Sequence, residues 1–120
     1  MSVCRGIRGA TTTPENTREA IFAATEELLQ QMVAANDIVE SDVAAMFLTA
    51  TQDLNAAFPA TAVRRMGWEK TALLCSPEIA VPNSLSKCIR VLILVNTDKG
   101  PDDLVHVYLR DATTLRSDNE

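Results

Sequence analysis

The sequence predicts an α+β fold, in which two helical segments lie among five segments typical of β-strands. Apolar residues recur at three- and four-residue steps between residues 15 and 36, as in an amphipathic helix, and residues 88–97 form an apolar run suited to a buried strand. A chain of 120 residues, 47% of them hydrophobic, can bury a compact core. We therefore expect a single domain over residues 1–120, ending in a polar, mobile tail at 117–120.

The first half of the chain is expected to form a strand, a long helix and a second strand. The first strand covers residues 3–10 and contains two glycines, which permit close approach of the backbone to its neighbours. The helix begins near residue 15, with either a capping box at 16–19 or Thr13, followed by proline, as its cap. A buried strand follows at 43–49. The apolar stripe of the helix consists of Ile21, Ala24, Leu28, Met32 and Ala35.

The second half is expected to add a short helix, three strands and one long loop. The strongest strand is apolar on both faces apart from one arginine, which places it at the centre of a sheet. The loop is longer than a tight turn and is therefore a candidate functional loop. In chain order these elements are a helix at 59–66 ended by Gly67, a strand at 70–75, the loop at 76–84, the strand at 88–97 and a strand at 105–109.

The composition excludes several classes of protein. The chain has 11 basic and 16 acidic residues, a formal charge of −5 and 4% aromatic residues, so it lacks the basic surface and stacking side chains of nucleic-acid-binding proteins. Its three cysteines without CxxC spacing and its single histidine predict neither a disulfide framework nor a metal site. No signal peptide and no apolar run long enough for a membrane span is found, so we expect a cytoplasmic protein without membrane partners.

The placement of arginines is the clearest chemical signal in the sequence. Arg90 lies inside the most apolar strand, where its guanidinium stays ionised and must meet an anion. That anion is either an acidic side chain of the chain itself or an anionic ligand. Three further arginines, Arg8, Arg64 and Arg116, favour the ligand, because planar, bidentate donors bind carboxylates well.

Four other side chains are candidates by residue type, and the first two of them have both a structural and a functional interpretation. Glu78 lies in the candidate loop, where a carboxylate is usually solvated, but it can accept a hydrogen bond from a ligand hydroxyl if the loop closes over a pocket. Tyr108 shares a strand face with His106 and Arg110, since side chains alternate, and packing of its ring alone explains it equally well. Cys75 is expected to be a small buried residue, and His106 is interpreted as structural.

Several separated segments occur in the same order in a known family. They are Arg5–Thr12, Ala50–Leu54, Phe58–Ala60 with Ala62–Arg64, Cys75 with Glu78, Lys87–Val91 and His106–Leu109. Together they resemble the monofunctional, Bacillus-type chorismate mutases of the AroH class. The similarity extends from residue 5 to residue 116, which makes it far more specific than any single arginine.

The resemblance implies a homotrimer of ferredoxin-like α+β subunits, whose sheets form a pseudo-α/β barrel with active sites between neighbouring subunits. It also implies the rearrangement of chorismate to prephenate, on the route to phenylalanine and tyrosine, without a cofactor or metal. Arg8 is implied to bind a substrate carboxylate, Arg90 the ether oxygen and a carboxylate, and Glu78 the ring hydroxyl. The other implied substrate contacts are Phe58, Leu74, Cys75, Tyr108, Leu115, Arg116 and, from the neighbouring subunit, Arg64.

The sequence departs from the family pattern at three places near the implied site. Thr61 stands where a lysine is expected, Leu74 where a threonine is expected, and residues 82–84 replace a glycine pair. These differences bear on substrate capture and loop mobility rather than on the chemical step. Two other functions stay open, namely a trimeric enzyme of the imine-deaminase type and a non-catalytic trimer that binds a dicarboxylate. The candidate site residues, present together, argue against both.

Overall fold

The structure is a computed structural model that describes residues 2–117. Residues 118–120 of the predicted tail lie outside the described residues. Over the described part, the chain forms five strands, two α-helices and three 3₁₀ helices. In chain order these are β1 (Val3–Thr12), α1 (Arg18–Asn36), η1 (Glu40–Asp42), β2 (Val43–Ala50), α2 (Ala60–Arg65), β3 (Leu73–Pro77), β4 (Cys88–Thr97), η2 (Pro101–Asp103), β5 (Val107–Tyr108) and η3 (Arg110–Ser117).

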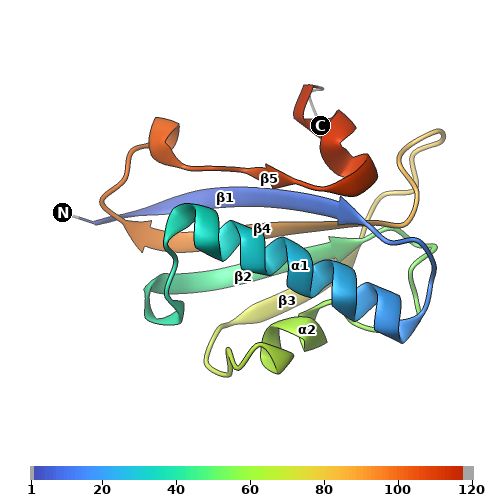
Figure 1. Cartoon of the computed structure of the whole chain (residues 1–120), viewed down its shortest axis with the longest axis horizontal. Coiled ribbons are helices and arrows are strands. Elements are labelled where there is room, and N and C mark those ends of the chain that lie inside the picture. Colours follow the sequence, from blue (N-terminus) through green and yellow to red (C-terminus); the bar gives the residue numbers. More distant parts are fainter. Residues whose placement is uncertain (1, 118–120) are drawn as a thin grey trace.

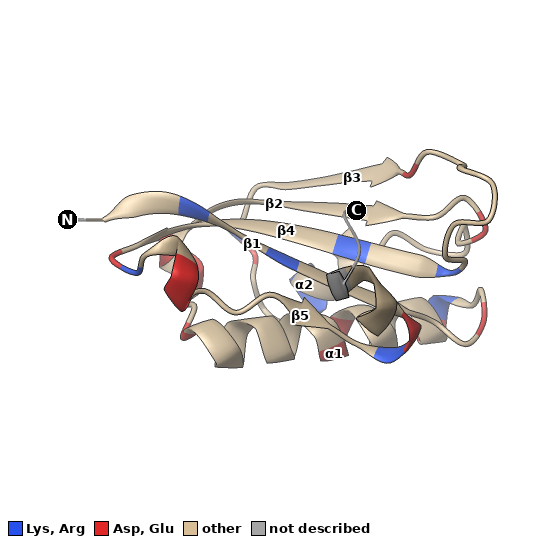
Figure 2. Ribbon diagram, turned by 90° about the horizontal axis from the view of Figure 1, so that it is seen from above, with Lys and Arg blue, Asp and Glu red and all other residues tan. Residues whose placement is uncertain are grey.

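The strands form one mixed sheet in the order β3-β2-β4-β1-β5. The central strand β4 is antiparallel to β2 and β1, while the outer strands β3 and β5 run parallel to their neighbours. Figure 1 and Figure 2 show both α-helices on the same side of this sheet. The predicted α+β fold and its central strand are thus confirmed. The element order departs from the β-α-β-β-α-β order of ferredoxin-like domains, because α2 lies between β2 and β3.

The main core lies between the sheet and α1. Three strands contribute Ile7, Leu48 and Ile93, and α1 contributes Leu28 and Met32. All five side chains are fully buried. Burial of a side chain of this size typically contributes about 1.5–3 kcal/mol, so this layer is the main source of stability.

Gly9 of β1 lets α1 lie close to the sheet. A Cβ atom at this position would overlap with Sδ of Met32 and stand 3.1 Å from Cδ1 of Leu28, which confirms that a glycine permits close approach here.

The predicted apolar stripe of α1 is wrong at its last residue, since Ala35 is exposed. One turn after Met32 the buried residue is Asn36, whose side-chain amide exchanges two hydrogen bonds with the backbone of Val105.

Helix α1 begins later than predicted, and its cap is a different residue. Thr17 is the N-cap, and its hydroxyl accepts a hydrogen bond from the backbone N–H of Ala20 at 3.1 Å. The predicted cap, Asn16, uses its side-chain oxygen elsewhere, because that oxygen accepts the N–H groups of Asn55 and Ala56. The predicted capping box is therefore wrong, and this asparagine ties the start of α1 to the segment before α2.

The two edge strands differ most from the prediction. β3 begins at Leu73 rather than at residue 70, because the N–H groups of residues 70 and 71 bind a carboxylate instead of a strand. β5 contains two residues instead of the predicted 105–109, because the backbone of Val105 bonds to Asn36. In both places a side chain replaces the ladder partner that the alternation pattern predicts.

Glu40 provides the carboxylate that precedes β3. Its Oε2 accepts hydrogen bonds from the N–H of Lys70 at 3.0 Å, the N–H of Thr71 at 3.1 Å and the Thr71 hydroxyl at 2.8 Å. The hydrogen bond from the Thr71 hydroxyl is the main reason that the pKa of Glu40 is lowered from its ordinary 4.5. The two backbone N–H bonds and the charge of Arg64 also lower this pKa, whereas desolvation raises it.

We expect Glu40→Gln to lower the thermal unfolding midpoint at neutral pH but to change it little in acid. The pKa of Glu40 is lower in the folded chain than in the unfolded one, so its contribution is complete above the ordinary value of 4.5 and is lost as the pH falls through the folded-state value. Thermal unfolding of both proteins near neutral pH and well below 4.5 measures this. An equal difference at both pH values would show that the charge is not the cause.

The described residues offer neither a membrane-spanning helix nor a metal site. No helix among them combines the length and the apolar character that crossing a membrane requires. Nor do three or more histidine, cysteine, aspartate or glutamate side chains gather there in a way that could hold a metal ion. The cytoplasmic location and the absence of a metal stay predictions from the sequence.

Candidate active site

The sheet face opposite the two α-helices carries the candidate site. Arg90 and Leu92 alternate along β4 with buried residues that face the helices. Paired residues lie on the same face of a sheet, so the register places Arg8 and Phe47 on either side of Leu92. It also places Thr49 beside Arg90. Two basic side chains from neighbouring strands therefore share this face.

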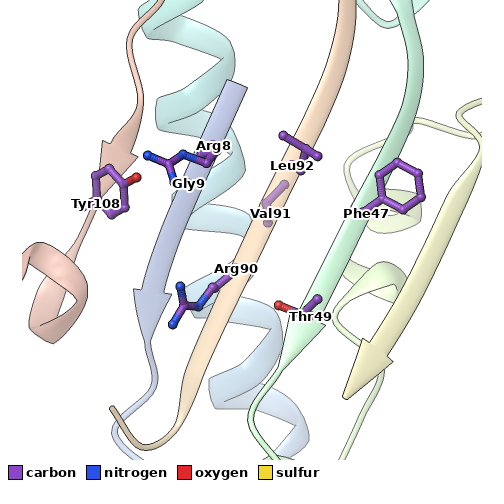
Figure 3. A pocket seen from close by; sticks show the side chains of 8 residues that line it. All are labelled: Arg8, Gly9, Phe47, Thr49, Arg90, Val91, Leu92 and Tyr108. Atoms are coloured by element: carbon purple, nitrogen blue, oxygen red, sulfur yellow. The ribbon is translucent and has the colours of Figure 1, made fainter. Parts of the chain in front are cut away.

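A cavity of about 290 Å³ opens on this face and is bordered by residues of β2, β4, β1 and β5 (Figure 3). In Figure 3 the side chain of Arg8 points towards Tyr108, and the guanidinium of Arg90 points towards β1. The lining residues are Arg8, Gly9, Phe47, Thr49, Arg90, Val91, Leu92 and Tyr108. Two cations above largely apolar walls suit a ligand with anionic groups on an apolar frame.

Glu78 is the internal anion that Arg90 meets. Its Oε2 lies 3.2 Å from Nε of Arg90 and accepts a hydrogen bond from the Thr49 hydroxyl at 2.6 Å. The side chain of Glu78 is 14% exposed, so the usual solvated carboxylate is not found here. The first alternative for Arg90, an acidic side chain of the chain itself, is confirmed. A ligand anion stays open as well, because the same guanidinium borders the cavity.

Arg8 lies in the interior of β1 and is held there by His106. The backbone N–H of Arg8 donates to Nδ1 of His106 at 3.0 Å, a partner that the sequence did not indicate. This bond requires the tautomer with the proton on Nε2. Arg110 does not share the face of Tyr108, because β5 ends and η3 begins at Arg110, whose Nε donates to Glu27 of α1 at 3.3 Å.

Phe58 and Cys75 line a second cavity, of about 690 Å³, near the ends of β2 and β3. Cys75 is paired with Leu48 of the main core, so it faces the helices and not the side of the sheet that bears Arg90. Burial raises the pKa of the Cys75 thiol, and a backbone hydrogen bond at Ala60 acts in the opposite direction. The residue is half-buried, close to the expectation for a small buried cysteine.

Three further predicted site residues, Leu74, Arg64 and Leu115, are not among the described residues that border the first cavity. Leu74 is 60% exposed at the edge of the sheet. Arg64 of α2 donates from Nη1 to the carbonyl of Trp68 at 2.8 Å. Leu115 is half-buried in η3, and the side chain of Arg116 lies outside the described structure. Among the side chains that the structure describes, one chain therefore gathers only part of the predicted set around this cavity.

Three comparisons with known proteins identify the same family. The family described as chorismate mutase type I matches residues 4–119. The chain belongs to this family. A chorismate mutase AroH of Thermus thermophilus is 51% identical over 117 residues, covering 97% of this chain and 96% of that protein. Another, of Bacillus subtilis (strain 168), is 45% identical over 115 residues, covering 95% and 91%. A solved chorismate mutase of Clostridium thermocellum has a TM-score of 0.90 and 52% identity, over 92% of this chain and 98% of that one.

Within this type I chorismate mutase, sequence reasoning missed five residues that line the cavity, namely Gly9, Phe47, Thr49, Val91 and Leu92. Thr49 is the most informative of them, because its hydroxyl orients the carboxylate of Glu78. Period-two alternation places Phe47 and Thr49 on one face of the expected strand. Without the strand register, however, no signal in the sequence assigns that face to the side of Arg90.

The cavity of this type I chorismate mutase offers charge and shape rather than reactive groups. Among the described residues, its polar side-chain groups are two guanidinium groups, a threonine hydroxyl and a tyrosine hydroxyl, and the Glu78 carboxylate lies 3.2 Å from Nε of Arg90. Such a set can bind carboxylates, select one conformer of a ligand and stabilise negative charge that develops in a fixed place.

Proposed function

We propose that this chain catalyses the intramolecular rearrangement of chorismate to prephenate. The observation that carries the proposal is the pair of guanidinium groups, from Arg8 on β1 and Arg90 on β4, that border one largely apolar cavity. The substrate bears carboxylates on a ring, which two cations above apolar walls complement. Membership of the type I chorismate mutase family supports the same reaction.

The chemistry of this rearrangement explains why the cavity needs no reactive side chain. An ether bond breaks and a carbon–carbon bond forms within one molecule, so no nucleophile, acid, base or cofactor takes part. The requirements are a compact substrate conformer and compensation for negative charge that develops on the ether oxygen. Arg8 and Arg90 hold the carboxylates of that conformer. Arg90 also stabilises the ether oxygen, and its cation is in place before the charge develops.

Glu78 contributes by fixing Arg90 before the substrate arrives. The ion pair engages Nε of Arg90, and the Thr49 hydroxyl holds the same carboxylate oxygen in place. Fixing a long side chain costs up to about 2 kcal/mol in lost rotamer freedom. The fold supplies this ordering in advance, so binding energy of the substrate is not spent on it. In this proposal Glu78 also accepts a hydrogen bond from the ring hydroxyl of chorismate.

The active unit in this proposal is a homotrimer whose sheets form a pseudo-α/β barrel. Phe58, Leu74 and Ile79 are 73%, 60% and 87% exposed in the single chain, which supports an interface that covers them. Phe58 and Arg64 lie away from the Arg90 cavity, and an adjacent copy brings such residues to it from outside. Light scattering after size-exclusion chromatography is expected to give a mass of three chains.

Mixing purified protein with chorismate tests the proposed reaction. The ultraviolet absorbance of chorismate is expected to fall as prephenate appears. Two results would overturn the proposal. One is inertness towards chorismate together with hydrolysis of imine or enamine compounds, as in the deaminase-type trimers. The other is calorimetric binding of a prephenate-like dicarboxylate without turnover, as in a non-catalytic trimer.

His106→Leu is expected to lower kcat/KM about tenfold, mainly through KM, since it removes one hydrogen bond from the backbone that carries Arg8. The ladder between β1 and β5 covers only two residue pairs, so the imidazole extends it by one bond at Arg8. His106→Asn can present Oδ1 where Nδ1 stood and is expected to keep most of the activity. Steady-state kinetics of both variants measure kcat and KM. Equal losses of kcat/KM in the two variants would exclude this hydrogen bond as the cause.

A further inference from the structure

We propose that the turn formed by residues 51–54 is a clamp that positions Glu78 and Arg90 by holding both ends of the 78–87 loop. Its catalytic consequence rests on the proposed function. The segment Ala50–Leu54 belongs to the family resemblance, yet none of its residues borders the cavity that holds Arg90. The turn is closed by a hydrogen bond from the N–H of Leu54 to the carbonyl of Thr51 at 2.9 Å. We call it the clamp turn.

The clamp turn holds the far end of the loop through two side chains. The carboxylate of Asp53 accepts the N–H of Lys87 at both oxygens, at 3.2 and 3.0 Å. The hydroxyl of Thr51 accepts the N–H of Cys88 at 3.0 Å and donates to the Asp53 carboxylate. The Thr51 N–H donates to the Cys88 carbonyl at 3.0 Å. Arg90 follows two residues after Cys88, so these bonds fix the start of the strand that carries it.

The same turn and the strand before it hold the near end of the loop. The N–H of Glu78 donates to the carbonyl of Ala50 at 3.0 Å, and Nε2 of Gln52 donates to the carbonyl of Glu78 at 3.1 Å. Thr49, two residues before Thr51, bonds to the Glu78 carboxylate. The backbone and the side chain of Glu78 are thus both fixed from one short segment.

Lys87 shows why the far end needs a clamp. Its φ of 48° lies in the left-handed region, which costs free energy for a residue with a side chain. The N–H of Lys87 faces Asp53, and its carbonyl accepts the N–H of Thr13 at 2.9 Å. These bonds stabilise the left-handed turn, which redirects the chain from the loop into β4.

The clamp turn is packed against the core, whereas the middle of the loop that it holds is exposed. Leu54 is 7% exposed and packs in a second core cluster with Ile21, Phe22 and Ile89. In the loop, by contrast, Ile79 is 87% exposed. Packing within the chain therefore fixes the loop weakly, and the hydrogen bonds at its two ends determine where Glu78 and β4 meet.

The test compares Thr51→Val with Thr51→Ser. Valine keeps the shape of threonine and removes the hydroxyl, whereas serine keeps the hydroxyl, so serine is the matched control. Thr51→Val is expected to lower kcat about ten- to a hundredfold with a smaller change in KM, because displacing a catalytic group by about 1 Å has effects of this size. Thr51→Ser is expected to retain most of the activity. Asp53→Asn, which keeps one carbonyl oxygen and loses the charge, serves as a second variant if Thr51→Val does not fold.

Amide hydrogen exchange of Lys87 and Cys88 measures the clamp independently of activity. Faster exchange at these amides in Thr51→Val, with unchanged exchange in the core of α1, is expected. Unchanged exchange at both amides would overturn the clamp itself. Faster exchange with parental kcat, in a protein that turns chorismate over, would overturn its role in positioning. If the parent protein does not turn chorismate over, the proposed function fails, while the exchange result still decides whether the turn holds the loop.

A double-mutant cycle then asks whether the clamp acts through Glu78. Thr51→Val is expected to cost much less in a Glu78→Ala background than in the parent, since a positioning residue has little effect once the group that it positions is absent. The same fold-loss in both backgrounds would show that Thr51 acts on activity by another route and would overturn the positioning role for Glu78. Thermal unfolding of all four proteins checks that each is folded at the assay temperature.

Discussion

Arg90→Ala is expected to turn chorismate over at least about a hundredfold more slowly than the parent protein, through kcat, because one preorganised donor typically contributes about 2.7–4 kcal/mol to transition-state stabilisation. Arg90 meets the conditions for such a contribution. It lies on the central strand, its side chain is only 32% exposed, and Glu78 holds its Nε. The rate at saturating chorismate, followed by ultraviolet absorbance, measures the loss.

Arg90→Lys is the matched control, because it keeps the positive charge and changes the shape of the group. A lysine has one ammonium group, which cannot both pair with Glu78 at the place of Nε and reach the cavity with a planar fork. Its loss of kcat is expected to be smaller than that of the alanine variant but still clear. Near-parental kcat in a folded, trimeric Arg90→Ala protein would remove Arg90 from the mechanism.

The central strand shows what the sequence can predict well. β4 covers Cys88–Thr97, the residues expected from the apolar run, because a strand with neighbours on both sides and little solvent needs apolar residues along its whole length. The short helix also lies close to its predicted place, since proline precedes it and Gly67, at a φ of 90°, follows it. In these elements the local pattern and the tertiary environment favour the same boundaries.

The edge strands show where local sequence patterns fail to predict the boundaries of an element. Glu40 and Asn36 each bond to a backbone segment far away in the sequence and thereby shorten β3 and β5. Such side-chain contacts leave no periodic signal. The same explanation applies to the start of α1, where Asn16 meets residues that precede α2, so that Thr17 becomes the cap.

The candidate site likewise contains residues that the sequence can predict and residues that only the structure reveals. Arg90 could be selected from the sequence, because a guanidinium inside an apolar strand requires an anion. The identity of that anion, Glu78, required the structure, as did the role of Thr49. Both depend on how β2 is aligned with β4, and a shift of one residue in that alignment would turn Thr49 towards the helices. Residues of the second cavity, such as Phe58, lie outside what one chain brings together.

Glu78→Ala is expected to lower kcat about ten- to a hundredfold with little net change in KM, a combination that distinguishes an orienting carboxylate from a simple binding group. Without Glu78 the guanidinium of Arg90 loses the ion pair to its Nε and gains rotational freedom, so it is less well placed when charge develops on the ether oxygen. The variant also loses the negative charge beside Arg90. This loss favours binding of an anionic substrate and offsets the missing hydrogen bond to the ring hydroxyl.

Glu78→Gln separates the two parts of this effect, because it keeps an oxygen that can accept the Thr49 hydroxyl bond but lacks the charge that attracts Arg90. Its kcat is expected to fall between those of the parent and Glu78→Ala, and kcat and KM for all three proteins are obtained from the same absorbance assay. A KM that rises in step with the loss of kcat would mean that Glu78 mainly binds the substrate. Parental kinetics in both variants would mean that the ion pair serves the fold alone, and that Arg90 is positioned by its strand without help from this carboxylate.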